Sequence, residues 1–257
     1  MPGSLVGAPC LQLERVSRHF GGLTAVDDVT LAVQAGARHA LIGPNGAGKT
    51  TLFNVISGEL APSAGSIALD GKDVSRLKPH QRAALGISRT FQITRLFPEL
   101  TATENVLLAC TALDPKRFAM FRPLSSHTEF TERAARLLDQ FGLASLAHEQ
   151  ARHISYGARR RLDVALALAG RPRLLLLDEP MAGLSAPERG AMRELIEGLD
   201  RSIAVLLIEH DMDVAFSFAE RVTVLHQGRV LADGSRDEVS ANELVQQAYL
   251  GAVGGGR

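Results

Sequence analysis

The sequence predicts an α/β fold with a largely parallel core sheet, a small antiparallel β layer and an inserted helical subdomain. Three short, mainly apolar runs favour the parallel sheet, at residues 37–42, 174–177 and 203–208. Such runs without regular alternation are typical of strands buried on both faces. Each run is followed by glycine or by acidic residues, and open α/β sheets bind ligands at the carboxyl ends of their strands. These three strand ends are therefore the first candidate site.

The antiparallel layer is predicted from three short strand-like segments with turn signals between them, at residues 11–16, 29–33 and 65–69. The stretch from about 101 to 169 has a mostly helical pattern, and apolar residues recur at helical spacing in residues 131–141. The helical part is therefore expected to interrupt the α/β core.

This pattern predicts the following division of the chain. The α/β core covers 11–91 and 166–250, the helical subdomain covers 92–165, and flexible tails cover 1–10 and 251–257.

Composition restricts the class of protein. Lys plus Arg and Asp plus Glu both number 28, so the net charge is zero and gives no reason to expect a nucleic-acid partner. The two cysteines, Cys10 in the N-terminal tail and Cys110, are too few for a disulfide framework, which favours a reducing compartment. The N-terminus lacks the features of a signal peptide, and no apolar run is long enough to span a bilayer.

A phosphate-binding loop follows the first apolar run. Residues 43–50 read GPNGAGKT and fit the pattern G-x-x-x-x-G-K-[ST] at every fixed position, with a plausible helix after them. Glycines let backbone N–H groups turn toward phosphate oxygens, and the helix N-terminus adds partial positive charge. Lys49 is expected to reach the β- and γ-phosphates, and Thr50 to coordinate Mg²⁺. The predicted nucleotide contacts here are Gly43, Pro44, Asn45, Gly46, Ala47, Gly48, Lys49, Thr50 and Thr51.

Two carboxylates end the leucine run. Asp178 is expected to hold Mg²⁺, and Glu179 to act as the general base that polarises the attacking water. An acid at a strand end is weak evidence alone, because loops are polar. Together with a phosphate loop it is strong, because the metal requires a carboxylate on a neighbouring strand.

Four further features distinguish among P-loop NTPases. Residues 154–161 read ISYGARRR and resemble the signature of ABC nucleotide-binding domains, generally LSGGQ. Gln92 resembles the Q-loop glutamine, His210 the switch histidine, and Phe20 the aromatic residue that stacks on adenine. The order and spacing of these residues are similar to that family from about residue 11 to 249.

The resemblance implies a P-loop NTPase fold and an ATPase that uses ATP and Mg²⁺, with Gln92 among the metal ligands and His210 and Gln92 beside Glu179 in catalysis. It also implies that two such domains meet head to tail. Ser155 and Gly157 would then contact the γ-phosphate of the ATP bound by a second ATP-binding subunit. Whether that subunit is identical or different stays open.

The sequence departs from the family pattern at several positions. The signature has Ile154, Tyr156 and Ala158 where Leu, Gly and Gln are general. The D-loop, residues 182–185, ends in Ser185 where the family generally has an acid. The missing acid puts communication across the dimer in doubt.

Several stretches, among them residues 89–105 and the ending at 246–251, resemble the ATP-binding subunits of bacterial branched-chain amino-acid importers. The resemblance implies two permease subunits, a periplasmic solute-binding protein that delivers the solute, and a place on the cytoplasmic face of the inner membrane. A groove at Arg95, Leu96, Phe97 and Pro98 is expected to receive a short permease helix. Similar subunits serve transport of urea or short amides, or lipopolysaccharide export.

Two other classes compete with a transport ATPase. A soluble ABC protein of DNA repair or of ribosomes usually carries a coiled coil or two such domains, and neither occurs in 257 residues. An inactive binding module is disfavoured because Lys49, Asp178, Glu179 and His210 are all present.

Overall fold

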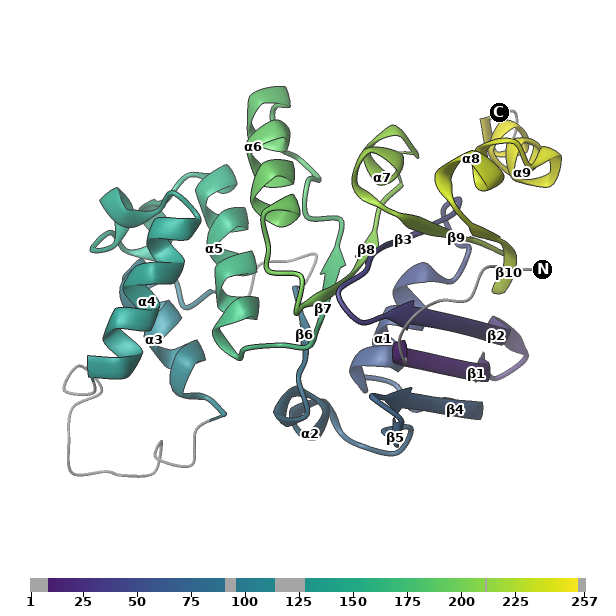
Figure 1. Ribbon diagram of the computed structural model, residues 1–257, viewed down its shortest axis with the longest axis horizontal. Helices are drawn as coiled ribbons and strands as arrows, with labels where there is room; N and C mark the ends of the chain where they lie inside the picture. The colour runs from purple at the N-terminus through teal and green to yellow at the C-terminus, as the bar shows by residue number, and fades with distance from the viewer. Residues whose placement is uncertain (1–8, 91–95, 114–127, 211, 254–257) are drawn as a thin grey trace. The chain divides into compact units, whose positions relative to one another are not determined.

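The structure is a computed structural model that describes residues 9–90, 96–113, 128–210 and 212–253 (Figure 1). The chain forms two compact units. The first unit combines Met1–Leu85 with Asp200–Arg257, and the second is Gly86–Leu199.

The first unit contains an antiparallel sheet with the strand order β2-β1-β4-β5. These strands are β1 (Pro9–Phe20), β2 (Leu23–Gln34), β4 (Ala64–Leu69) and β5 (Lys72–Asp73). The predicted antiparallel layer is therefore confirmed, with longer strands than expected. The placement of Cys10 in a flexible tail is wrong, because Cys10 lies in β1 and is buried. At the other end, α9 continues to Val253, beyond the predicted start of the C-terminal tail.

The same unit contains parallel strands beside the phosphate loop. Strand β3 (Arg38–Ile42) runs parallel to β8 (Ala204–Ile208) on one side and to β9 (Arg221–His226) on the other, and β10 (Arg229–Gly234) pairs with β9 in antiparallel orientation. Every residue of β3 and β8 is buried, as the apolar runs predict. The helices of this unit are α1 (Lys49–Ser57), α2 (Pro79–Ala84), α7 (Met212–Phe218), α8 (Arg236–Ser240) and α9 (Glu243–Val253).

The second unit combines helices with two parallel strands. Strand β6 (Ile87–Arg89) pairs with β7 (Leu174–Asp178). The helices are α3 (Ala102–Thr111), α4 (Thr128–Gln140), α5 (Tyr156–Ala169) and α6 (Ala186–Glu197). Helices α3, α4 and α5 pack against one another. The amphipathic pattern at 131–141 is thus a helix that buries Ala134, Leu137 and Leu138.

The second unit holds the residues predicted for the helical subdomain together with β6, β7 and α6. The predicted domain boundaries stay a prediction. Among the described residues, no helix combines the length and the hydropathy that crossing a bilayer requires.

Candidate functional site

The phosphate loop connects β3 to α1, and its path depends on glycine at two positions. Gly43 has φ +152° and Gly48 has φ +100°, conformations that other residues rarely adopt. A Cβ atom at Gly43 would collide with the carbonyl oxygen of Leu225, and one at Gly48 with that of Ala25. Backbone from β9 and from β2 therefore packs directly against the loop.

Lys49 and Thr50 begin α1 at the end of this loop. The Lys49 side chain is buried, and its Nζ donates to the carbonyl oxygens of Gly43 at 2.6 Å and of Pro44 at 3.0 Å. Thr50 is exposed in the first turn. The N-cap residue is Gly48, which has no side chain to cap that turn, so the first N–H groups of α1 are suited to binding an anion.

The other end of α1 is fixed by a buried arginine. Arg82 of α2 is 1% exposed, and its Nη1 donates to the carbonyl oxygens of Val55 and Ile56, both at 2.6 Å. Burial lowers the pKa of Arg82 to about 10, a value at which the guanidinium is still charged near neutral pH. A cation at a helix C-terminus complements the helix dipole, so Arg82 stabilises the helix that presents Lys49 and Thr50.

The C-terminal helix α9 packs beside the same loop. The hydroxyl of Tyr249 is buried next to the backbone of Gly43 and has no partner at hydrogen-bond geometry in the described part of the chain. Burial raises the pKa of Tyr249 to about 12.

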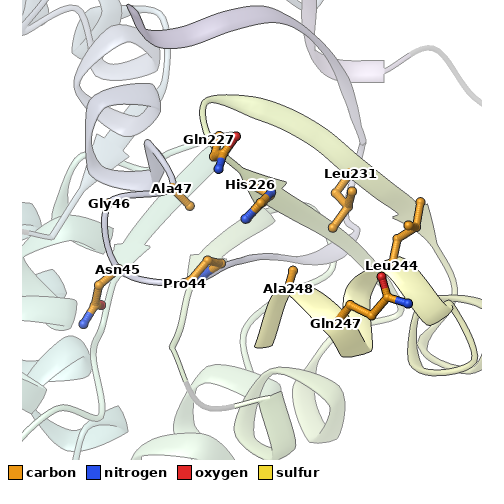
Figure 2. A pocket seen from close by; sticks show the side chains of 10 residues that line it. All are labelled: Pro44, Asn45, Gly46, Ala47, His226, Gln227, Leu231, Leu244, Gln247 and Ala248. Carbon is orange, nitrogen blue, oxygen red and sulfur yellow. The ribbon is translucent and has the colours of Figure 1, made fainter. Parts of the chain in front are cut away.

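A cavity of about 560 Å³ opens between the loop, the β9–β10 turn and α9 (Figure 2). The predicted contacts Phe20, Lys49 and Thr50 are not among its described lining residues, so this cavity is not the whole of the predicted nucleotide site. Its lining residues are Pro44, Asn45, Gly46, Ala47, His226, Gln227, Leu231, Leu244, Gln247 and Ala248.

Two further predicted residues belong to the first unit. Phe20 ends β1, is 43% exposed and lies under the guanidinium of Arg18 at 4.7 Å from the ring centroid. The ring is therefore not part of the core and is accessible to a ligand. His210 follows β8 with a side chain that is 58% exposed, and its Nδ1 lies 3.9 Å from a carboxylate oxygen of the buried Glu209.

Asp178 and Glu179 lie at the end of β7 in the second unit. Asp178 is buried and accepts a hydrogen bond from Nη2 of Arg89 at 2.9 Å, in an ion pair whose side chains are 4% and 7% exposed. Arg89 lies on the neighbouring strand β6. Glu179 has φ +47°, an uncommon conformation for a residue with a side chain, which is typical of functional sites.

Ser155 and Gly157 lie at the N-terminus of α5, in the same unit. Ser155 is the N-cap, and its Oγ accepts from the backbone N–H of Ala158 at 3.3 Å. Ser155 is exposed, whereas Gly157 is buried. A Cβ atom at Gly157 would collide with the carboxylate of Glu188 in α6. The Ser155 hydroxyl thus lies at the N-terminus of a helix of 14 residues, where the helix dipole adds partial positive charge.

Gln92 and Arg95 lie outside the described residues, and the predicted roles of both stay predictions. The buried amide of Asn105 holds the adjoining segment in place. Asn105 Oδ1 accepts from the N–H of Phe97 at 2.9 Å, and Nδ2 donates to the carbonyl oxygens of Phe97, Leu100 and Thr101. Phe97 itself is 58% exposed.

The predicted site residues thus divide between the two units. Phe20, the phosphate loop and His210 belong to the first unit, and Asp178, Glu179, Ser155 and Gly157 to the second. Sequence reasoning missed Arg89, Arg82, Asn105 and Tyr249. The position of Arg89 shortly before Gln92 could have marked it as a residue of the site. Nothing in the sequence, however, indicates that its partner is Asp178.

Comparisons with known proteins agree on the family. Residues 26–182 match the family of ABC transporters, and residues 229–254 match the C-terminal family of branched-chain amino acid ATP-binding cassette transporters. The high-affinity branched-chain amino acid transport ATP-binding protein BraF of Pseudomonas aeruginosa is 41% identical, over 95% of this chain and 98% of that protein. The high-affinity branched-chain amino acid transport ATP-binding protein LivG of Salmonella typhimurium is 39% identical, over 95% of this chain and 98% of that protein.

One solved structure has a similar fold over most of this chain. It is an ATP-binding cassette of an ABC transporter in its ADP conformation, 28% identical, with a TM-score of 0.82 over 95% of this chain and 99% of that chain. The chain therefore belongs to the ATP-binding proteins of ABC transporters, in the branched-chain amino acid ATP-binding cassette family.

Proposed function

We propose that this chain hydrolyses ATP to power the import of branched-chain amino acids, and that the predicted site residues carry out this reaction. The observation that carries the proposal is the phosphate loop, in which Gly43 and Gly48 occupy positions closed to any side chain and lead into Lys49 and Thr50. The import role rests on the relatives of which BraF is one.

The loop binds the phosphates of ATP through backbone N–H groups and the N-terminus of α1. Lys49 exchanges its contacts with the carbonyl oxygens of Gly43 and Pro44 for the β- and γ-phosphates. Because these oxygens already hold Nζ beside the loop, little side-chain entropy is lost when the phosphates arrive. Phe20 stacks on the adenine through its exposed ring.

Thr50, Asp178 and Gln92 would hold Mg²⁺, which neutralises phosphate charge when bound. Their hydroxyl, carboxylate and amide oxygens are the hard donors that this ion prefers. Within the described residues, no group of three or more His, Cys, Asp or Glu side chains could hold a metal.

Glu179 accepts a proton from the attacking water, and His210 orients the reacting groups. The φ of +47° at Glu179 turns the backbone directly after Asp178. Asp178 would therefore serve the metal, and Glu179 the attacking water. Ser155 and the N–H of Gly157 bind the γ-phosphate of ATP held by a second ATP-binding subunit, identical or different.

The permease is proposed to dock on Leu96, Phe97 and Pro98. Phe97 is a large exposed apolar side chain on a segment that the buried Asn105 holds in place, which is suited to a fixed docking point. The chain would then lie on the cytoplasmic face of the membrane, below two permease subunits. Solute specificity would come from those subunits and from a periplasmic binding protein.

Replacing Phe97 with Asp tests the docking point. Transport and co-purification with the permease should be lost, while ATP binding by the purified chain stays at the parental level. Replacing the exposed Leu244 on α9 with Asp is the matched control and should leave assembly intact. Normal assembly of Phe97→Asp would remove this surface from the proposal.

The substrate is tested by deleting the gene and measuring uptake of labelled leucine and labelled urea in parallel. We expect leucine uptake to fall and urea uptake to stay unchanged, with recovery when the parental gene is returned. Loss of urea uptake alone would move the substrate to urea or short amides. No change in either would leave a redundant system or an export role, and purification of the tagged chain with its membrane partners would decide between them.

A further inference from the structure

Tyr156 makes a directional connection between the signature and the D-loop, within the second unit. Its hydroxyl donates to the carbonyl oxygen of Ala182 at 3.0 Å and accepts from Nε of Arg160 at 3.0 Å. The Arg160 guanidinium also lies over the tyrosine ring, 5.4 Å from the centroid, and Arg160 is 5% exposed. The hydroxyl is therefore fixed by one donated and one accepted hydrogen bond.

The D-loop is shaped to receive this ring. Gly183 has φ +75°, and a Cβ atom there would lie 3.1 Å from Cε1 and from the hydroxyl oxygen of Tyr156. The ring thus packs on the backbone of Gly183, while its hydroxyl binds the preceding residue. Glycine alone adopts this positive φ without strain and also leaves room for the tyrosine ring.

A second contact joins the same two segments. Gly157 packs against the carboxylate of Glu188, which in turn accepts hydrogen bonds from the N–H of Ser185 at 2.9 Å and from its Oγ at 2.6 Å. The hydrogen bonds from the Ser185 side chain and backbone lower the pKa of the Glu188 carboxyl below its ordinary value. Ser185 is the N-cap of α6. The N-terminus of α5 therefore lies against the D-loop at Tyr156 and against the first turn of α6 at Gly157.

We propose that Tyr156 is a positioning residue that fixes the D-loop to the signature, so that both meet a partner's nucleotide site as one rigid element. The proposal rests on the proposed function, because it assigns Ser155 and Gly157 to the partner's ATP. Tyr156 stands where the general signature has a glycine, which could make no such contact. The chain thus adds a side-chain connection in the same region in which the D-loop has Ser185 in place of an acid.

The test compares Tyr156→Phe with Thr103→Val in the full chain. Tyr156→Phe removes the hydroxyl and keeps the ring on Gly183. Thr103→Val removes another hydroxyl bond to a backbone carbonyl in the same unit, from Thr103 Oγ1 to the oxygen of Ala147 at 2.8 Å, away from the signature. Both variants lose a hydroxyl bond to a backbone carbonyl oxygen, and Tyr156→Phe also loses the bond accepted from Nε of Arg160. A difference between them therefore reports the position of Tyr156 together with its bond to Arg160.

Hydrogen exchange measured by mass spectrometry is the first readout, because it does not depend on turnover. The N–H groups of Ala182 and Leu184 are bonded within the turn, to the carbonyl oxygens of Glu179 and Met181. We expect Tyr156→Phe to accelerate exchange in peptides covering 179–186 by about threefold or more, with no such change in Thr103→Val. Unchanged exchange in this segment would overturn the proposal.

Turnover is the second readout. We expect Tyr156→Phe to lower kcat by about two- to tenfold, with an unchanged Kd for ATP, because the hydrogen bonds with Ala182 and Arg160 are lost. Tyr156→Gly, which restores the general signature residue, should lower it further because the ring contact is also lost. Parental kcat in Tyr156→Phe would contradict the positioning role. If Glu179→Gln also hydrolyses ATP at the parental rate, the proposed function has failed instead, and the exchange result still decides the connection.

Discussion

The phosphate loop and the signature–D-loop region reach a fixed geometry by different means. The loop is held by backbone: neighbouring carbonyl groups close Gly43 and Gly48 to side chains, and Lys49 binds the loop's own carbonyl oxygens. The signature and D-loop are held by side chains, namely Tyr156, Arg160 and Glu188. The first region matches the family pattern at every fixed position, and the second departs from it at several.

This difference explains why the two regions tolerate sequence change unequally. A backbone-built loop admits no replacement where a Cβ atom would enter another chain segment. A region held by side chains can exchange one set of contacts for another, as Ser185 shows. Asp and Ser are both good N-cap residues, so Ser185 retains the cap of α6 although it lacks the charge.

The largest effect is expected for the buried ion pair in the second unit. Arg89→Ala leaves the carboxylate of Asp178 buried without its cation, which should lower the free energy of unfolding by about 3–5 kcal/mol. Arg152→Ala removes an exposed pair with Glu99 and should change stability by less than about 1 kcal/mol. Denaturant unfolding of both variants measures this. Equal small losses would show that Arg89 does not support the site.

Backbone control of the loop predicts a graded effect in two glycine variants. Gly48→Ala should abolish ATP binding and cost about 2 kcal/mol or more, because the methyl group meets the carbonyl oxygen of Ala25 at a positive φ. Gly46→Ala has φ +77° but no atom within 4 Å of the new methyl group, so only strain of about 1 kcal/mol is expected. Thermal unfolding and ATP titration compare them, and equal behaviour would contradict the role of close backbone packing.

Capping of α6 predicts a smaller effect that depends on pH. Ser185→Ala should lower stability by about 1 kcal/mol. Ser185→Asp should also lower stability, because an ionised Asp cannot donate the bond that Ser185 Oγ gives to Glu188 and would face that carboxylate. Hydrogen bonds from Ser185 lower the pKa of Glu188 in the folded chain, so their stabilisation is present above the ordinary value of about 4.5 and is lost as pH falls through the lowered one. The difference between parent and Ser185→Ala should therefore shrink in acid. A constant difference would exclude Glu188 from the cap.

The smallest effect distinguishes the two tyrosines. Tyr249→Phe removes a buried hydroxyl without a partner at hydrogen-bond geometry in the described structure, so stability should stay unchanged or rise by about 1 kcal/mol at most. Tyr156→Phe removes a hydroxyl with two hydrogen-bond partners and should lower the stability of the chain. Thermal melting of the pair tests this. A clear loss in Tyr249→Phe would indicate that its hydroxyl bonds the Gly43 backbone.

The sequence predicted the parallel strands and the glycine-containing turn between β3 and α1, because buried apolar runs and required glycines leave local signals. It did not indicate what Tyr156 contacts, since the partner Ala182 contributes a backbone oxygen that any residue would supply. The assignment of residues 154–161 to the signature stays a prediction. The sequence also did not indicate the roles of Arg82, Arg89 and Asn105. Each depends on a contact that only the folded chain creates, and a buried polar side chain looks in the sequence like an exposed one.

The most direct test of ATP hydrolysis by this chain is a comparison of the parent with Glu179→Gln, in ATP turnover and in ATP binding. We expect turnover to fall by about a hundredfold or more while ATP binding is retained, because the general base is lost and the phosphate loop is intact. Turnover at the parental rate in Glu179→Gln would contradict the assignment of Glu179 and the proposed mechanism with it.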